Sequence, residues 1–80
     1  MRLDKYLKVS RIIKRRTVAN DACDAGKVTV NGKIARASYD VKIGDIVEIT
    51  LGEKTVKFKV AEVKEVIRKE DACTMYEYID

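Results

Sequence analysis

The hydrophobic spacing of this chain changes at Gly26, and this change limits the folds that the chain can adopt. Before Gly26, apolar residues recur three and four positions apart, as in residues 3–7, which is the spacing of an amphipathic helix. After Gly26, apolar and polar residues alternate, starting at Val28 and Val30, which is typical of strands. We therefore predict an α+β fold in which two short N-terminal helices pack on a small, twisted antiparallel sheet.

Cap and turn residues predict where the second helix ends and the sheet begins. Thr17 offers the side-chain oxygen that is preferred at a helix N-cap, and Gly26 suits the left-handed residue that often follows a helix. We therefore predict a helix over residues 17–25. The pair Asn31-Gly32 is a strong signal for a two-residue hairpin turn. Strands are predicted at residues 28–30, 33–36, 47–51 and 56–60.

The polar residues of the two helices are expected on their solvent side. In the first helix, residues 2–8, Asp4 is expected to pair with Lys8 one turn later. In the second helix, small side chains allow close packing against the first helix. The polar positions of the second helix are expected to face water: Asn20, Asp21 and Asp24.

The C-terminal region fits two interpretations up to residue 67, because Val63, Val66 and Ile67 suit either the end of a strand or a helical turn. Beyond it, apolar residues recur at helical spacing, which favours a short C-terminal helix with an acidic outer side. The apolar positions are Ala72, Met75, Tyr76 and Ile79, and the acidic ones are Glu70, Asp71 and Glu77.

Length and composition exclude several classes of protein. A chain of 80 residues can bury one small core and is not expected to enclose a substrate pocket as well. No apolar run exceeds two residues, so neither a transmembrane helix nor a signal peptide is predicted. Cys23 and Cys73 lie far apart and are interpreted as buried apolar residues of a protein in the reducing cytoplasm.

The net charge of +4 conceals a strong asymmetry between the two halves of the chain. Residues 1–36 hold ten Lys and Arg but three Asp and Glu, whereas residues 37–80 hold seven and ten. This separation indicates that a polyanion binds to the N-terminal half, with nucleic acid favoured over an anionic membrane.

The cations of the N-terminal half form two groups. One group follows one side of the first helix, and the other lies directly before the second helix, where the N–H groups and the helix dipole also favour an anion. Such groups are often no more than a solvated face, but their position and the charge asymmetry favour phosphate binding. The helix group is Arg2, Lys5 and Lys8, and the other, here called the basic cluster, is Arg11, Lys14, Arg15 and Arg16.

The other side chains of the basic half indicate which kind of nucleic acid is bound and whether catalysis is expected. The aromatic residues in this half and directly after it are Tyr6 and Tyr39, too few for single-strand binding by base stacking, whereas Arg and Lys suit backbone and shape recognition of folded RNA. These residues alone do not exclude DNA. The chain has no histidine, no paired-carboxylate motif and no glycine-rich phosphate loop, so we expect no enzymatic activity, no cofactor and no metal site.

Four motifs, taken together, resemble the RNA-binding domain named after ribosomal protein S4. They are RLDKYL at residues 2–7, RRT at 15–17, AGKVTVNGK at 25–33 and KIGDIVEI at 42–49. The resemblance covers residues 1–50 and implies that the two helices and the following strand form one RNA-binding face. Together with Lys8 of the first helix, the RNA contacts expected in this sequence are Arg2, Lys5, Arg11, Lys14, Arg15, Arg16 and Lys33.

Over its full length, including VKFKVAEVKEVIRKEDA at residues 56–72, the chain resembles small stand-alone members of this family from low-GC Gram-positive bacteria. They are relatives of the ribosome-associated heat-shock protein and act in ribosome quality control. The resemblance implies one RNA-binding domain over residues 1–80, with a core motif in 1–50 and a strand and helix in 54–80. It also implies binding to large-subunit rRNA and peptidyl-tRNA, and support for a partner factor that adds C-terminal alanine tails. Away from the ribosome, we expect a monomer that binds no membrane.

Two alternatives remain open at this stage. The first is an S4-type protein that serves ribosome assembly or binds another structured RNA. It would sediment with empty precursors rather than with large subunits that retain tRNA. The second is a protein-interaction domain whose acidic second half binds a basic partner. Its binding would survive nuclease treatment and the removal of charge at Arg15 and Arg16.

Overall fold

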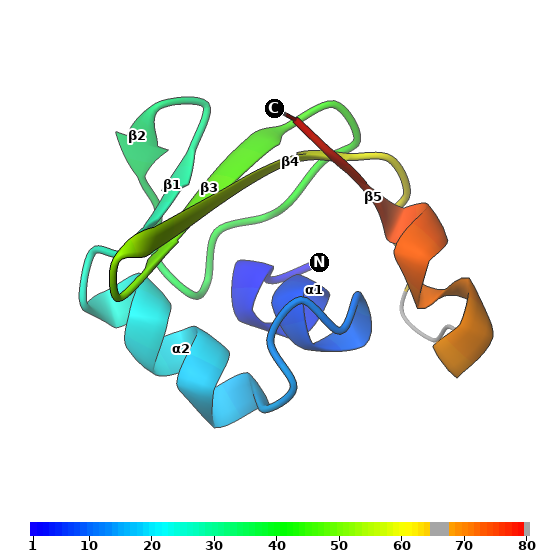
Figure 1. Cartoon of the computed structure of the whole chain (residues 1–80), viewed down its shortest axis with the longest axis horizontal. Coiled ribbons are helices and arrows are strands. Elements are labelled where there is room, and N and C mark those ends of the chain that lie inside the picture. The colour runs from blue at the N-terminus through cyan, green and yellow to red at the C-terminus, as the bar shows by residue number, and fades with distance from the viewer. Residues whose placement is uncertain (65–67, 80) are drawn as a thin grey trace.

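Two helices lie against one face of a five-stranded antiparallel sheet in the computed structural model, which describes residues 1–64 and 68–79 (Figure 1). The strand order is β2-β1-β3-β4-β5, and every pairing between neighbours is antiparallel. The predicted α+β architecture is therefore confirmed. The elements are α1 (Leu3–Val9), α2 (Arg16–Asp24), β1 (Val28–Val30), β2 (Lys33–Ile34), β3 (Ile46–Leu51), β4 (Lys54–Val60), the 3-10 helix η1 (Lys69–Met75) and β5 (Tyr76–Tyr78).

The core lies between the helices and the inner face of the sheet. Leu3, Tyr6 and Leu7 are fully buried, as their helical spacing predicts. The alternation in the strands also holds, except at Ile34 in β2 and at Leu51 at the end of β3, which are 71% and 41% exposed. The inner face of the sheet contributes Val28, Val30, Val47, Ile49, Phe58 and Val60 to the core.

The two ends of α2 are fixed in different ways. Its N-cap residue is Arg15, which makes no side-chain capping bond, so the prediction that Thr17 caps the helix is wrong. The first turn is fixed instead by a tertiary contact of Arg16, described below. At the other end, Gly26 has a φ of +74°, and the N–H groups of Gly26 and Lys27 donate to the carbonyls of the last turn at 3.0 Å. This is the predicted glycine-ended helix, with the bonding of a Schellman motif.

The hairpin between β1 and β2 forms as predicted. Asn31 and Gly32 have φ values of 54° and 84°, which a two-residue type I′ turn requires. The second strand is shorter than predicted and ends at Ile34, because the chain then leaves the sheet and crosses to the start of α1. There the N–H of Leu3 donates to the carbonyl of Tyr39 at 2.8 Å.

The predicted short C-terminal helix is found only as a 3-10 helix, and it does not extend to Ile79 as the helical spacing suggests. A 3-10 helix occupies residues 69–75, and β5 then pairs with β4 at the edge of the sheet (Figure 1). The side chains of Tyr76 and Tyr78 alternate with Glu77, so the strand period prevails here over the helical spacing. Met75 is buried as expected, and its carbonyl accepts the hydroxyl proton of Tyr6 at 2.6 Å. Two residues of the ambiguous stretch, Val66 and Ile67, lie outside the described residues.

Candidate nucleic-acid interface

A buried carboxylate, that of Asp4, joins α1 to α2. Its side chain is only 3% exposed. Oδ1 accepts hydrogen bonds from Arg2 Nε at 3.2 Å and from the N–H of Lys5 at 2.8 Å. Oδ2 accepts from Arg16 Nε and from Asn20 Nδ2, both at 3.3 Å. One negative charge thus holds two arginines that are 14 positions apart in the sequence.

The surroundings of Asp4 keep it ionised. Burial acts to raise its pKa, but the hydrogen bonds from Asn20, Arg16 and the N–H of Lys5, together with the charge of Arg16, outweigh burial and lower the pKa below its ordinary value. The predicted pairing of Asp4 with Lys8 is wrong, because both carboxylate oxygens are taken up by the donors named above. Asn20, expected to face water, is half-buried at this contact.

Both arginines remain accessible from solvent. The side chain of Arg2 is 51% exposed and that of Arg16 is 48% exposed. A guanidinium carries five N–H donors in one plane, and within the described part of the chain Asp4 engages only the Nε of each arginine. The terminal amino groups therefore remain free to bind an anion in the fork geometry that suits phosphate.

The remaining cations of α1 and the basic cluster surround this pair. Arg11 follows the C-cap residue of α1 and has a φ of +63°, a left-handed conformation that residues other than glycine seldom adopt. Its N–H donates to the carbonyl of Lys8 at 3.1 Å, which turns the chain sharply toward α2. Lys5 is half-buried. The other cations here are exposed: Lys8, Arg11, Lys14 and Arg15.

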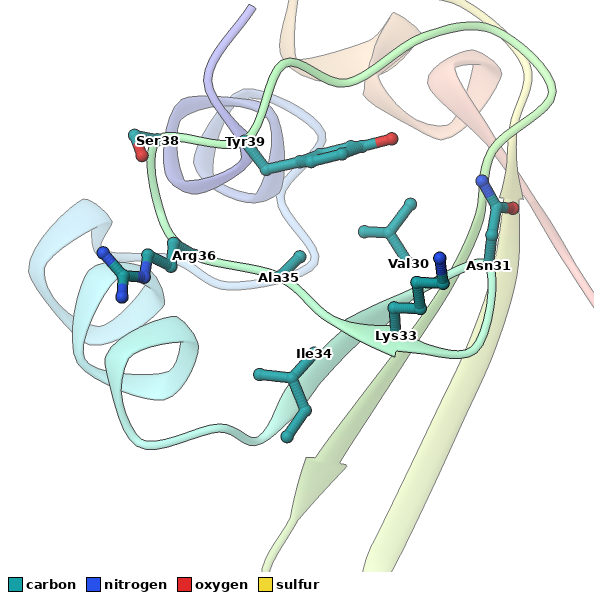
Figure 2. Close-up of a pocket in the computed structure, with 8 residues that line it drawn as sticks. All are labelled: Val30, Asn31, Lys33, Ile34, Ala35, Arg36, Ser38 and Tyr39. Atoms are coloured by element: carbon teal, nitrogen blue, oxygen red, sulfur yellow. The ribbon is translucent and has the colours of Figure 1, made fainter.

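Lys33 is the predicted contact that lies elsewhere, in an open hollow beside the β1–β2 hairpin (Figure 2). The hollow has a volume of about 490 Å³. The hollow is formed at the surface by a loop and is not enclosed by the core, so it does not conflict with the expectation that so short a chain encloses no substrate pocket. Its lining residues are Val30, Asn31, Lys33, Ile34, Ala35, Arg36, Ser38 and Tyr39.

A second buried carboxylate, Asp45, fixes the wall of this hollow. Its Oδ2 accepts from the hydroxyl of Tyr39 at 3.1 Å and from the N–H of Lys42 at 3.0 Å, and its Oδ1 accepts from Asn31 Nδ2 at 3.1 Å. Burial, followed by the hydrogen bond to Asp45, raises the pKa of Tyr39 above its ordinary value. Sequence reasoning missed the roles of Tyr39 and Asp45, because nothing in the local pattern marks a contact between the hairpin and a later loop.

Three further observations concern a thiol nucleophile, a metal site and a membrane-spanning helix. Cys23 is buried, and burial together with the charges of Asp4 and Asp24 raises the pKa of its thiol to about 11, so it is not a thiolate nucleophile at neutral pH. Across residues 1–64 and 68–79, the structure contains no group of three side chains that could hold a metal ion. No helix in these two ranges is both long and apolar enough to cross a membrane.

Comparison with known proteins identifies the family of this chain. The S4 domain family matches residues 1–47. A protein of Streptococcus pneumoniae is 58% identical to this chain over 79 residues, and the alignment covers 99% of this chain and 90% of that protein. A protein of Bacillus subtilis is 51% identical over 76 residues, and the alignment covers 95% of this chain and 88% of that protein. Both are named RQC P-site tRNA stabilizing factor.

Among solved structures, the trimeric structure of Vibrio cholerae Heat Shock Protein 15 superimposes with a TM-score of 0.91 at 29% identity. The superposition covers 99% of this chain and 81% of that one. The two helices and the sheet of the present structure are therefore shared with that protein over nearly the whole chain. This chain belongs to the S4 domain family, within the group whose curated members are named RQC P-site tRNA stabilizing factor.

Proposed function

We propose that this protein is a non-catalytic, cytoplasmic RNA-binding component of ribosome-associated quality control. In this role it binds large-subunit rRNA and peptidyl-tRNA on stalled large ribosomal subunits. It thereby supports a partner factor that adds C-terminal alanine tails to the nascent chain. Residues 1–80 act as one RNA-binding domain, which is monomeric away from the ribosome. The names of its relatives, which refer to quality control and to P-site tRNA, support the pathway.

The observation that carries the proposal is the anchoring of Arg2 and Arg16 on Asp4. A free arginine loses rotational freedom when it binds a phosphate, and that loss weakens binding. Because Asp4 already restricts both side chains, much of this cost is met during folding. The two guanidinium groups then present their remaining donors from adjacent helices, as recognition of the RNA backbone requires.

The exposed cations around this pair supply the less directional part of the interaction. Lys8, Lys14 and Arg15 attract the RNA and neutralise phosphates as it approaches. The N-cap residue of α2 makes no side-chain capping bond, so its first-turn N–H groups add to the field that favours a phosphate. If about five phosphates are neutralised, affinity falls about a hundredfold between 50 and 200 mM salt.

The test is the binding of Arg16→Ala to purified large ribosomal subunits that carry P-site tRNA, measured by co-sedimentation. We expect affinity to fall about tenfold, the effect of losing one charge-assisted interaction. Lys54→Ala is the matched control, since Lys54 is an exposed cation at the start of β4 that is not among the expected RNA contacts, and its replacement should leave affinity unchanged. A folded Arg16→Ala protein that binds as tightly as the wild type would contradict the proposal.

The same preparation distinguishes the alternative functions. The proposal requires the wild-type protein to sediment with large subunits that retain tRNA and to be released by nuclease. Sedimentation with empty precursor particles would instead indicate a role in ribosome assembly. Binding that survives nuclease and the double change Arg15→Ala and Arg16→Ala would indicate a protein partner.

A further inference from the structure

The open hollow between the β1–β2 hairpin and residues 35–39 combines an aromatic ring, a cation and an apolar floor (Figure 2). We propose that it binds one unpaired nucleotide of the RNA, with the base against Tyr39 and a phosphate at Lys33. This inference rests on the proposed RNA-binding function and adds a second, separate contact to it. The volume of about 490 Å³ lies in the range of ordinary small-ligand sites, about 300–1,000 Å³.

The aromatic wall of the hollow is Tyr39. Figure 2 shows its ring spanning the upper side of the hollow, with Val30 and Lys33 directed toward it from the hairpin. Tyr6, the tyrosine of α1, is fully buried and cannot reach a base. Tyr39 is partly buried and lines the hollow, so its ring provides a surface for one base, since bases bind aromatic side chains by face-to-face stacking.

The hairpin supplies the floor and the charge. Val30 and Ala35 are buried apolar residues that line the floor of the hollow. Lys33 pairs with Val30 across the turn, so its side chain emerges on the hollow side of β2, whereas that of Ile34 points away (Figure 2). Lys33 is exposed and has no ion-pair partner within residues 1–64 and 68–79.

The hollow is fixed in position relative to the arginine pair. The hydroxyl of Tyr39 is held by Asp45, and its carbonyl accepts the N–H of Leu3 at 2.8 Å. Leu3 follows Arg2 directly, so the ring lies on the segment that is bonded to the start of α1. An RNA strand whose phosphate is held by Arg2 therefore passes close to the hollow. A nucleotide that is not paired in a helix can turn into it at little cost, because no base pair has to open.

The experiment compares two short RNA duplexes that are identical except that one carries a single additional, unpaired 2-aminopurine nucleotide. We expect the whole wild-type protein to bind the duplex with the unpaired nucleotide about tenfold more tightly and to quench its fluorescence, as stacking on a ring does. Tyr39→Leu should abolish this preference and leave affinity for the fully paired duplex unchanged. Tyr39→Phe, which keeps the ring, should retain the preference.

Lys33→Gln tests the phosphate contact. It should weaken binding of the duplex with the unpaired nucleotide and lower its salt slope by about 1, with Lys54→Gln as the unaffected control. Free adenosine monophosphate tests whether the hollow binds a nucleotide without RNA. We expect it to compete only at concentrations far above those of the RNA, because it lacks the neighbouring phosphates. Displacement of the RNA at equal concentration would overturn the assignment to an RNA nucleotide.

Thermal unfolding must first show that the Tyr39 variants are folded, and Tyr39→Phe ensures a result even if Tyr39→Leu is unstable. Equal binding of the two duplexes by the wild type, or loss of the preference in Tyr39→Phe, would overturn the nucleotide site and leave the proposed function standing. Failure of the wild type to bind either duplex, together with failure to sediment with large subunits that carry P-site tRNA, would overturn both.

Discussion

Asp4 and Asp45 are two buried carboxylates that perform the same structural task with different donors. Each joins segments that are distant in the sequence, and each accepts hydrogen bonds from both side chains and the backbone. At Asp4, two of the side-chain donors are arginines that remain half exposed. At Asp45, the side-chain donors are the neutral groups of Asn31 and Tyr39.

This difference indicates which parts of the surface are organised for an external anion. A charge held by neutral donors is satisfied within the fold and orients nothing toward solvent. A charge held by arginines positions cations whose other donors face outward. We infer that Asp45 serves stability and the shape of the hollow, whereas Asp4 serves stability and the orientation of Arg2 and Arg16. Variants at the two sites should separate these roles.

The largest effect is expected at Asp45. Asp45→Ala removes a buried acceptor and leaves the amide of Asn31 and the N–H of Lys42 without it, so the free energy of unfolding should fall by about 3 kcal/mol. Urea unfolding at pH 7 measures this loss. Asp40→Ala is the control, because Asp40 is exposed and solvent screens its ion pair with the N-terminus, so its loss should cost far less than that of Asp45. Equal losses at the two positions would mean that Asp45 does not hold the hairpin to the loop.

The next largest effect on the free energy of unfolding is expected at Asp4, and it depends on pH. Asp4→Asn keeps the size of the side chain but removes its charge, and we expect a loss of about 1–2 kcal/mol at pH 7. The folded-state pKa of Asp4 is lowered from its ordinary value of 3.8. The carboxylate therefore stabilises the fold fully above pH 4, and this contribution is lost as the pH falls through the lowered pKa.

Urea midpoints between pH 7 and pH 3 measure this dependence. In Asp4→Asn, stability should decrease less steeply in the acid range than in the wild type. Asp40 also has a lowered pKa, through its hydrogen bond to the N-terminal ammonium, so Asp40→Asn is the matched control. If Asp4→Asn retains the full acid dependence of the wild type, Asp4 is not the carboxylate that these arginines stabilise.

The same two sites show what the sequence can and cannot predict. Gly26 and the Asn31-Gly32 pair determine local backbone geometry by themselves, so the end of α2 and the hairpin were predicted correctly. Two of the side-chain partners of Asp4, Arg16 and Asn20, come from another helix, so no spacing rule along α1 predicts them. Local reasoning therefore assigned Asp4 to Lys8 and assigned the start of α2 to a cap at Thr17. Both errors have the same cause, a tertiary contact that replaces a local one.

The sequence predicts which cations belong to the candidate site, but it does not predict how their side chains are arranged in space. Charge counting along the chain identifies the basic half, and the family resemblance selects the same residues. Only the fold shows that Arg2 and Arg16 share one carboxylate, and that Lys33 lies in the hollow with Tyr39. The C-terminal strand was missed because its tyrosines also fit a helical spacing, and only pairing with the edge of β4 decides between the two.

A smaller effect is expected at Asn20, a neutral side-chain donor to Asp4. Asn20→Ala removes one hydrogen bond and should lower the free energy of unfolding by about 1 kcal/mol. Because both arginines and their charge remain, affinity for large subunits should stay within about twofold of the wild type. Asp21→Ala, an exposed neighbour, controls for changes in helix propensity. A tenfold loss of affinity in Asn20→Ala would show that the neutral donor also orients the RNA-binding surface.

The smallest effect is expected at Arg11, where stability and binding should move in opposite directions. Its φ of +63° is costly for arginine but not for glycine, so Arg11→Gly should raise the free energy of unfolding by up to about 1 kcal/mol. The lost charge should weaken binding to large subunits two- to threefold. Arg11→Ala keeps the unfavourable backbone and loses the same charge, so it should bind like Arg11→Gly but unfold more easily. If Arg11→Gly binds as tightly as the wild type, the left-handed residue at the end of α1 is retained for the turn alone, and the RNA-binding surface is confined to the arginines held by Asp4 and their nearest neighbours.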